Sequence, residues 1–224
     1  MTLSVGIGSF GTIGRQVAKV LDDGGLPGLS LGLVSARDKD QAAERMAGFR
    51  KPVAVVDLGE LAQCDVVLEA APVPTGALLG LDAVRAAAEG EIFSVKMVTR
   101  KPPGGLKGAP HLEQNQISVD GLTEAKLVFR GTAREGAIGF PANVNVAAAL
   151  SLAGIGPDRT TLEIWADPGV DRNTHHIEVE SDSARFALDI ATIPTEENPK
   201  TGKITALSVI ACLRSLTQTL RVGT

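Results

Sequence analysis

Cysteine is scarce in this sequence of 224 residues, with Cys64 and Cys212 as its only two examples. Neither has a histidine or a second cysteine at the spacing of a metal-ligand set. Cys64 falls in a predicted helix-to-strand turn and Cys212 in a predicted buried helix. We therefore interpret both as structural thiols and expect no metal site.

The chain also lacks a basic run and a long apolar run. Its formal net charge is −4, so we expect no nucleic acid or anionic membrane surface as a partner. No apolar stretch is long enough to span a bilayer, and the N-terminus enters a predicted strand with no basic region or cleavage site before it. We expect a soluble cytoplasmic protein with an ample core.

The sequence does contain a glycine-rich stretch, SVGIGSFGTIG, at residues 4–14. An apolar strand is predicted over residues 3–7, and a helix is predicted to open at Thr12. In this pattern Gly6 permits a tight turn, Gly8 admits a pyrophosphate close to the backbone, and Gly11 lets the helix pack close to its strand. The helix N-terminus would attract the phosphates. We expect cofactor contacts from Gly6, Gly8, Ser9, Phe10, Gly11, Thr12 and Ile13.

A second strand is predicted over residues 29–35, which completes a βαβ unit with parallel strands. An acidic residue usually binds the adenosine ribose at the end of such a strand, but this segment contains Ser35 and Arg37, with Asp38 as an expected helix N-cap. A hydroxyl and a guanidinium suit a 2′-phosphate. We expect NADP to be accepted, alongside NAD; the alternative is that Arg37 is an ordinary solvated charge.

The repeating pattern breaks at Pro72. Strands are predicted over residues 53–56 and 66–69, and small residues that include Ala71 leave room for a ribose. The chain then passes directly to a segment typical of a later strand end, too soon for a six-stranded doubly wound sheet. Either the domain is reduced, or residues between Pro72 and Val73 have been omitted. We favour omission, which a Cα–Cα distance well above ~3.8 Å would show.

From Ile92 onward the pattern changes to alternating strands, which predict a mainly antiparallel sheet with one buried face. Phe93, Val95 and Met97 are expected on that face. Residues 101–116 are predicted to form a loop because they are rich in proline and glycine. Helices are predicted over residues 80–89, 143–153 and 204–216.

Three histidines are candidates for proton transfer near neutral pH. His111 lies in the predicted loop, where we expect a solvated side chain. His175 and His176 begin the predicted strand HHIEVES, whose alternation places His175 with Ile177 toward a buried or cleft side and His176 toward water. From position alone, His175 is either catalytic or a core histidine bonded to a carbonyl.

Longer runs carry a family resemblance. They are TRKPPGGLKG (99–108), GTAREGAIGFPANVNVAAALSLAGIG (131–156), WADPG (165–169), RNTHHIEVESDSARF (172–186) and EENPKTGKITALSVIACLR (196–214). With the glycine loop they cover most of the chain, which resembles the L-aspartate dehydrogenase family. The resemblance implies an α/β protein with an N-terminal Rossmann dinucleotide-binding domain (1–72), a C-terminal α+β domain for substrate, catalysis and dimerisation (73–202), and a C-terminal helix packing back on the first domain (203–224).

The resemblance also implies a reaction and a site. The reaction is reversible, NAD- or NADP-dependent oxidation of L-aspartate to iminosuccinate, which water converts to oxaloacetate and ammonia. His175 is the implied catalytic residue, Asn145 the implied nicotinamide-side asparagine with Asn143 as the alternative, and Gly76 and Ala77 are implied to lie near the nicotinamide. A cytoplasmic homodimer in NAD biosynthesis, with hand-off of iminosuccinate to a downstream enzyme, is also implied.

The substrate carboxylates need cationic or N–H partners. The candidates are Arg100, Lys101, Arg134 and Arg172, and each has a structural or solvated alternative. Two rival functions are a related two-domain reductase of the dihydrodipicolinate reductase kind, for which we find no lysine just after the histidine pair, and a protein that senses NAD(P) without turnover.

Overall fold

The computed structural model describes residues 2–68, 78–196 and 201–219. These form two compact units, which are described separately: unit 1 comprises residues 2–68 and 205–219, and unit 2 comprises residues 78–196 and 201–204. No helix among the described residues is both long and apolar enough to cross a membrane. The junction at Pro72, and with it Ala71, Gly76 and Ala77, lies outside the described residues.

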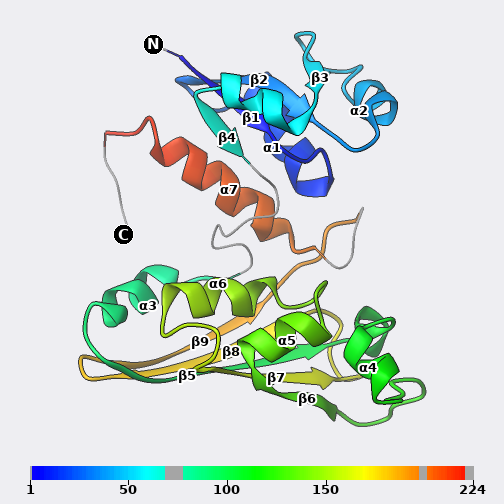
Figure 1. The fold of residues 1–224 in the computed structure, drawn as a ribbon, viewed down its shortest axis with the longest axis vertical. Coiled ribbons are helices and arrows are strands. Elements are labelled where there is room, and N and C mark those ends of the chain that lie inside the picture. The colour runs from blue at the N-terminus through cyan, green and yellow to red at the C-terminus, as the bar shows by residue number, and fades with distance from the viewer. Residues whose placement is uncertain (1, 69–77, 197–200, 220–224) are drawn as a thin grey trace. The chain divides into compact units, whose positions relative to one another are not determined.

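Unit 1 contains a parallel sheet with helices packed against it (Figure 1). Its strands follow the order β3-β2-β1-β4, and every pair is parallel. Its elements are β1 (Leu3–Ile7), α1 (Thr12–Asp22), β2 (Leu29–Ser35), α2 (Lys39–Arg45), β3 (Ala54–Val56), η1 (Leu58–Gln63), β4 (Val66–Leu68) and α7 (Lys203–Ser215).

The core of unit 1 combines residues from both ends of the sequence. Val5 and Ile7 of β1 are fully buried, because both faces of a parallel sheet are covered. Val209 and Leu213 of α7 belong to the same apolar cluster. Arg214 and Thr217 donate hydrogen bonds to the carbonyls of Gly25 and Pro27, at 3.1 and 3.0 Å. Cys212 is exposed, so the prediction that this cysteine is buried is wrong.

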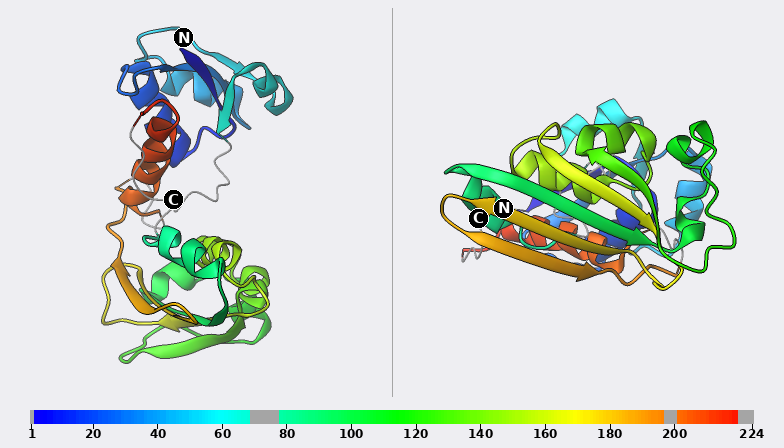
Figure 2. Two further views of the ribbon diagram at one scale, coloured as in Figure 1. Left: turned by 90° about the vertical axis from the view of Figure 1, so that its left-hand side faces the viewer. Right: turned by 90° about the horizontal axis from the view of Figure 1, so that it is seen from below.

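Unit 2 is a five-stranded sheet with helices on one face (Figures 1 and 2). The order is β6-β7-β5-β8-β9; only β5 and β7 pair in parallel, which confirms a mainly antiparallel sheet. Its elements are α3 (Leu81–Ala88), β5 (Ile92–Lys101), η2 (Pro103–Leu106), α4 (Pro110–Gln114), β6 (Lys126–Thr132), α5 (Ala133–Gly139), α6 (Asn145–Ala153), β7 (Thr160–Ala166), β8 (Thr174–Ser181) and β9 (Arg185–Ala191).

Local geometry changes two expectations for this unit. The register of β5 against β8 shifts between Ile92 and Ser94, and Phe93 is 54% exposed rather than buried with Val95 and Met97. Such a bulge reverses the side-chain alternation on one side of the shift. Residues 101–116 are also more than a loop, since they contain η2 and α4, each with a proline in its first turn, where the missing N–H costs nothing.

Candidate active site

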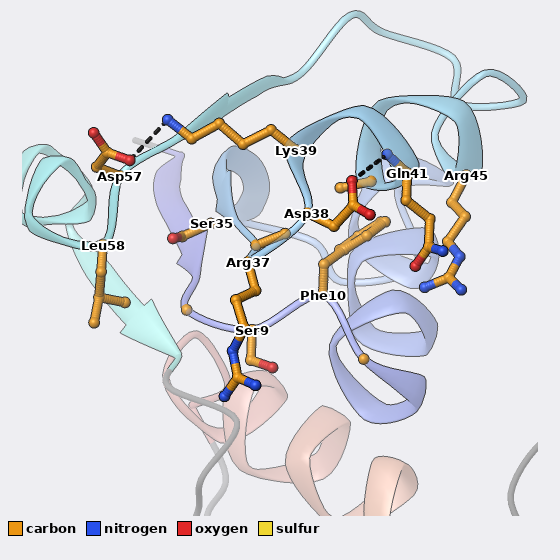
Figure 3. A pocket seen from close by; sticks show the side chains of 14 residues that line it. Ser9, Phe10, Ser35, Arg37, Asp38, Lys39, Gln41, Arg45, Asp57 and Leu58 are labelled. Atoms are coloured by element: carbon orange, nitrogen blue, oxygen red, sulfur yellow. Dashed lines mark hydrogen bonds and ion pairs between the residues drawn. The ribbon is translucent and has the colours of Figure 1, made fainter.

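A pocket of about 800 Å³ lies at the carboxyl ends of β1 and β2 (Figure 3), and the predicted cofactor residues Gly6, Thr12 and Ile13 are not among its lining residues. Ligands bind at this edge of open parallel sheets. Among the predicted residues, Gly8, Ser9, Phe10, Gly11, Ser35 and Arg37 line the pocket. Eight further residues line the pocket and were not predicted as cofactor contacts: Ala36, Asp38, Lys39, Gln41, Ala42, Arg45, Asp57 and Leu58. Four of these residues lie in α2, and Asp38 is its N-cap.

The α1 N-terminus provides the phosphate-binding character of this pocket. Gly11 is the N-cap residue, no side chain caps the helix there, and the first turn contains no acidic residue. The first N–H groups of a helix lack intrahelical acceptors and attract anions. A Cβ built on Gly11 would meet only Ser9 Oγ, at 3.9 Å. The backbone at Gly11 is therefore open to a ligand, and these residues fit a dinucleotide pyrophosphate.

The roles predicted for Gly6 and Gly11 in folding are wrong. Gly6 lies inside β1 with its added Cβ 3.1 Å from Cys64 Sγ, so it makes no turn. Gly14 is the glycine that permits close packing, because its Cβ would lie 1.9 Å from the Ser9 carbonyl oxygen. The stretch contains overlapping glycine pairs three residues apart, Gly8 with Gly11 and Gly11 with Gly14. Only the position of the helix start shows which pair packs against the strand.

The charged residues of the pocket favour an anionic ligand. Lys39 pairs with Asp57 at 2.7 Å, and this hydrogen bond raises the pKa of Lys39. Asp38 accepts a hydrogen bond from the Gln41 backbone N–H at 3.0 Å, which confirms its predicted capping role. Within the described part of the chain, Arg37 and Arg45 form no ion pair. Figure 3 shows the Arg37 side chain extending toward the glycine loop.

The proton-transfer candidate of unit 2 is the buried His175. The predicted face assignment is confirmed: His175 is 4% exposed and shares its face with the buried Ile177, whereas His176 lies on the other face. His175 Nδ1 lies 2.8 Å from Thr99 Oγ1 on the neighbouring strand. Burial, followed by the charge of Lys101, lowers the pKa of His175 to about 3. The imidazole is therefore neutral across the ordinary pH range.

His176 has different surroundings. Its Nδ1 lies 2.7 Å from Asp189 Oδ1 and its Nε2 3.5 Å from Glu178 Oε1, and the hydrogen bond to Asp189 raises its pKa. A pocket of about 340 Å³ opens on this face of the sheet. Neighbouring carboxylates favour the protonated form of His176, whereas burial favours the neutral form of His175.

The four candidate partners for the substrate carboxylates differ in position. Arg100 pairs with Asp167 at 2.9 Å, Arg134 with Asp158 through two bonds, and Arg172 with the adjacent Asp171 through two bonds. Lys101 is 5% exposed, and the alternation of β5 places it on the face of Thr99 and His175. Lys101 is thus the candidate that shares the His175 face.

The structure places the two remaining polar candidates, Asn145 and His111, on helices. Asn145 is the first residue of α6 and is exposed, so no buried amide requires a partner there. Its role in contacting the nicotinamide stays a prediction. His111 lies on α4, and its ring centroid is 5.3 Å from those of Phe129 and Phe140. The expectation of a solvated loop histidine is wrong, because proline-initiated α4 packs it against aromatic rings.

Similarity to known families covers both units. The C-terminal domain family of aspartate dehydrogenase matches residues 82–216, and the NAD-binding domain family of homoserine dehydrogenase matches residues 10–101. An aspartate dehydrogenase structure from Thermotoga maritima aligns with a TM-score of 0.62 at 21% identity and covers all of both chains. At that identity the likeness shows the fold, a Rossmann domain followed by an α+β domain.

Two relatives have a higher sequence identity to this chain than that structure has. The L-aspartate dehydrogenase of Bradyrhizobium diazoefficiens is 48% identical over 267 positions, covering 99% of this chain and 94% of the relative. L-aspartate dehydrogenase 3 of Bordetella bronchiseptica is also 48% identical, covering 99% and 98%. Since this chain has 224 residues, at least 43 of the 267 aligned positions (267 less 224) have no counterpart in it. By the extent and identity of these matches, the chain belongs to the L-aspartate dehydrogenase family.

Proposed function

We propose that this protein catalyses the reversible NAD(P)-dependent oxidation of L-aspartate, with His175 as its acid/base residue. The observation that carries the proposal is a buried, neutral imidazole held at Thr99 on the face shared with Lys101, in a chain of this family. In the reaction, Cα of L-aspartate loses a hydride and the amino group loses a proton, giving iminosuccinate. Water then adds and ammonia leaves, giving oxaloacetate.

Each group has a separate task. Bound NAD(P)⁺ supplies the hydride acceptor. Unit 1 binds its phosphates through the open backbone at Gly11 and the α1 N-terminus. His175 takes a proton from the substrate amine or the attacking water. Lys101 binds a substrate carboxylate. The negative charge of this carboxylate offsets the positive charge of the Lys101 ammonium, which makes the nearby imidazole a stronger base.

The direct test is NAD(P)H absorbance after mixing the full chain with L-aspartate and each cofactor, and after mixing oxaloacetate, ammonia and reduced cofactor. Turnover in either direction supports the proposal. Absence of turnover in both directions, with cofactor binding retained in calorimetry, contradicts it. That outcome would favour a second candidate function, an NAD(P)-binding protein without turnover. This candidate is supported by the 43 or more aligned positions of the Bradyrhizobium diazoefficiens relative that have no counterpart in this chain.

Arg37 is proposed to favour NADP over NAD. Its guanidinium lines the pocket without an ion pair in the described chain, and Ser35 lies two residues before it. We expect Arg37→Ala to raise the KM for NADP about 10- to 100-fold, as for loss of a charged hydrogen bond, with a much smaller change for NAD. Arg50→Ala is the control, because Arg50 is an arginine of unit 1 that does not line the pocket and pairs with Asp23. Equal losses for both cofactors in Arg37→Ala would contradict this role.

Lys101 is proposed to bind the substrate, and two measurements test it. We expect Lys101→Met to raise the KM for L-aspartate about 10- to 100-fold through loss of a charged hydrogen bond. The same change removes a positive charge near His175, so the His175 pKa should rise above its value of about 3 in an NMR titration. Lys96→Met is the control, because Lys96 lies on the opposite face of β5 and pairs with Glu163. An unchanged KM for L-aspartate in Lys101→Met would refute the substrate-binding role, and an unchanged His175 pKa would refute an electrostatic effect of Lys101 on the imidazole.

The wider setting is proposed from the family resemblance. We infer a cytoplasmic homodimer that takes part in NAD biosynthesis, with iminosuccinate passed to a downstream enzyme. Size-exclusion chromatography with light scattering tests the dimer; a monomer at micromolar concentration would contradict it.

A further inference from the structure

Thr99 and His175 form a cross-strand pair in the buried part of unit 2. They are register partners on the antiparallel strands β5 and β8, and they are 1% and 4% exposed. The next pair on the same face, Met97 with Ile177, is apolar and buried. In such surroundings a ring nitrogen needs a protein partner, because an unpaired buried polar atom is costly. The Thr99 hydroxyl is that partner for Nδ1.

The same hydroxyl also lies near an acceptor. Thr99 Oγ1 is 2.8 Å from His175 Nδ1 and 3.3 Å from the carbonyl oxygen of Thr174. A carbonyl can only accept, and a threonine hydroxyl has one proton. Both contacts are hydrogen bonds only if Thr99 donates to the carbonyl and accepts from a proton on Nδ1. In the other arrangement Thr99 donates to an unprotonated Nδ1. The lone pairs of Thr99 Oγ1 and of the Thr174 carbonyl oxygen then face each other.

We propose that Thr99 is a positioning residue that holds His175 in the Nδ1-protonated form, which leaves Nε2 as the unprotonated nitrogen for proton transfer. The inference rests on the proposed function for its catalytic meaning, although the tautomer itself exists without turnover. A neutral imidazole carries one proton, on either Nδ1 or Nε2. Which nitrogen carries it is set by the hydrogen bonds that the ring makes with its fixed neighbours. Threonine suits this task because its branched side chain is restricted at χ1.

The test uses ¹⁵N-histidine-labelled full-length protein, with the ring nitrogens distinguished by long-range ¹H–¹⁵N NMR. Single His111→Gln and His176→Gln variants assign the signals. We expect Nδ1 protonated in the unmodified protein and in Thr99→Ser, which keeps the hydroxyl. In Thr99→Val we expect protonation to shift toward Nε2 and kcat to fall roughly tenfold, or about 1.4 kcal/mol, with a smaller change in KM. Thr160→Val is the control, since Thr160 is a buried threonine of β7 whose hydroxyl donates to a carbonyl at 2.9 Å.

Each outcome separates the two proposals. Protonation at Nε2 in the unmodified protein overturns the positioning role, even if Thr99→Val does not fold. An unchanged tautomer in folded Thr99→Val also overturns it. If the tautomer responds as expected while L-aspartate is not turned over, the positioning role is supported and the proposed function fails. If L-aspartate is turned over and kcat falls equally in Thr160→Val, the effect is general destabilisation and the positioning role fails.

Discussion

Replacing His175 by asparagine lowers kcat for L-aspartate by roughly 10²- to 10⁴-fold, the usual contribution of one acid/base side chain. Asparagine is a polar side chain of smaller volume, so much of the buried site can remain packed. His176→Asn is the matched control, because that ring lies on the opposite sheet face with Asp189 and Glu178. The measurement is initial-rate kinetics with both cofactors, alongside thermal unfolding.

Two results would contradict the prediction. Comparable loss in both variants would mean that the sheet, rather than one imidazole, had been disturbed. Full activity in His175→Asn would transfer the acid/base role to another group. The expected result is loss of activity confined to His175→Asn, with little change in cofactor affinity, because His175 is not among the residues that line the pocket of unit 1.

A methyl group at Gly14 is expected to destabilise unit 1 by about 3 kcal/mol and to abolish measurable cofactor binding. The added Cβ in Gly14→Ala would lie 1.9 Å from the Ser9 carbonyl oxygen, so the glycine loop or α1 has to move. The glycine loop lines the pocket proposed to bind the phosphates, and α1 begins next to it. Chemical denaturation measures the loss of stability, and calorimetry with NAD and NADP measures the loss of binding.

Gly11→Ala is the control that separates packing from ligand approach. Its Cβ meets only Ser9 Oγ at 3.9 Å, so stability should change by less than about 1 kcal/mol. Cofactor affinity should still fall, because the methyl group occupies backbone space open to the pyrophosphate. Wild-type stability in Gly14→Ala would refute the packing argument, and wild-type affinity in Gly11→Ala would refute the phosphate contact.

Strand and helix positions were predictable where one local signal was strong. The β8 alternation correctly separated the faces of His175 and His176, and Asp38 was correctly predicted as an N-cap. The glycine roles failed for a physical reason. Spacing alone allows two overlapping frames, and the choice depends on how closely α1 approaches the Ser9 carbonyl, which is a tertiary property.

Other differences also came from tertiary structure. A bulge in β5 reversed the face of Phe93, and packing of α4 placed His111 against Phe129 and Phe140. The burial of Lys101 on the His175 face was not predicted, because residues 101–116 were expected to form a loop, whereas Lys101 is the last residue of β5. Thr99 had no sequence signal of its own. Its hydrogen bond to His175 follows from the register between β5 and β8.

The origin of unit 1 in two distant stretches has a consequence for synthesis on the ribosome. Val209 and Leu213 of α7 complete a core whose other members, including Val5 and Val17, are translated much earlier. The N-terminal stretch therefore emerges first but lacks part of its apolar covering until α7 is released. All strands of the unit 2 sheet precede α7, so this sheet can form while unit 1 is still incomplete. Nascent unit 1 therefore exposes, until α7 is translated, the apolar surface that Val209 and Leu213 later cover.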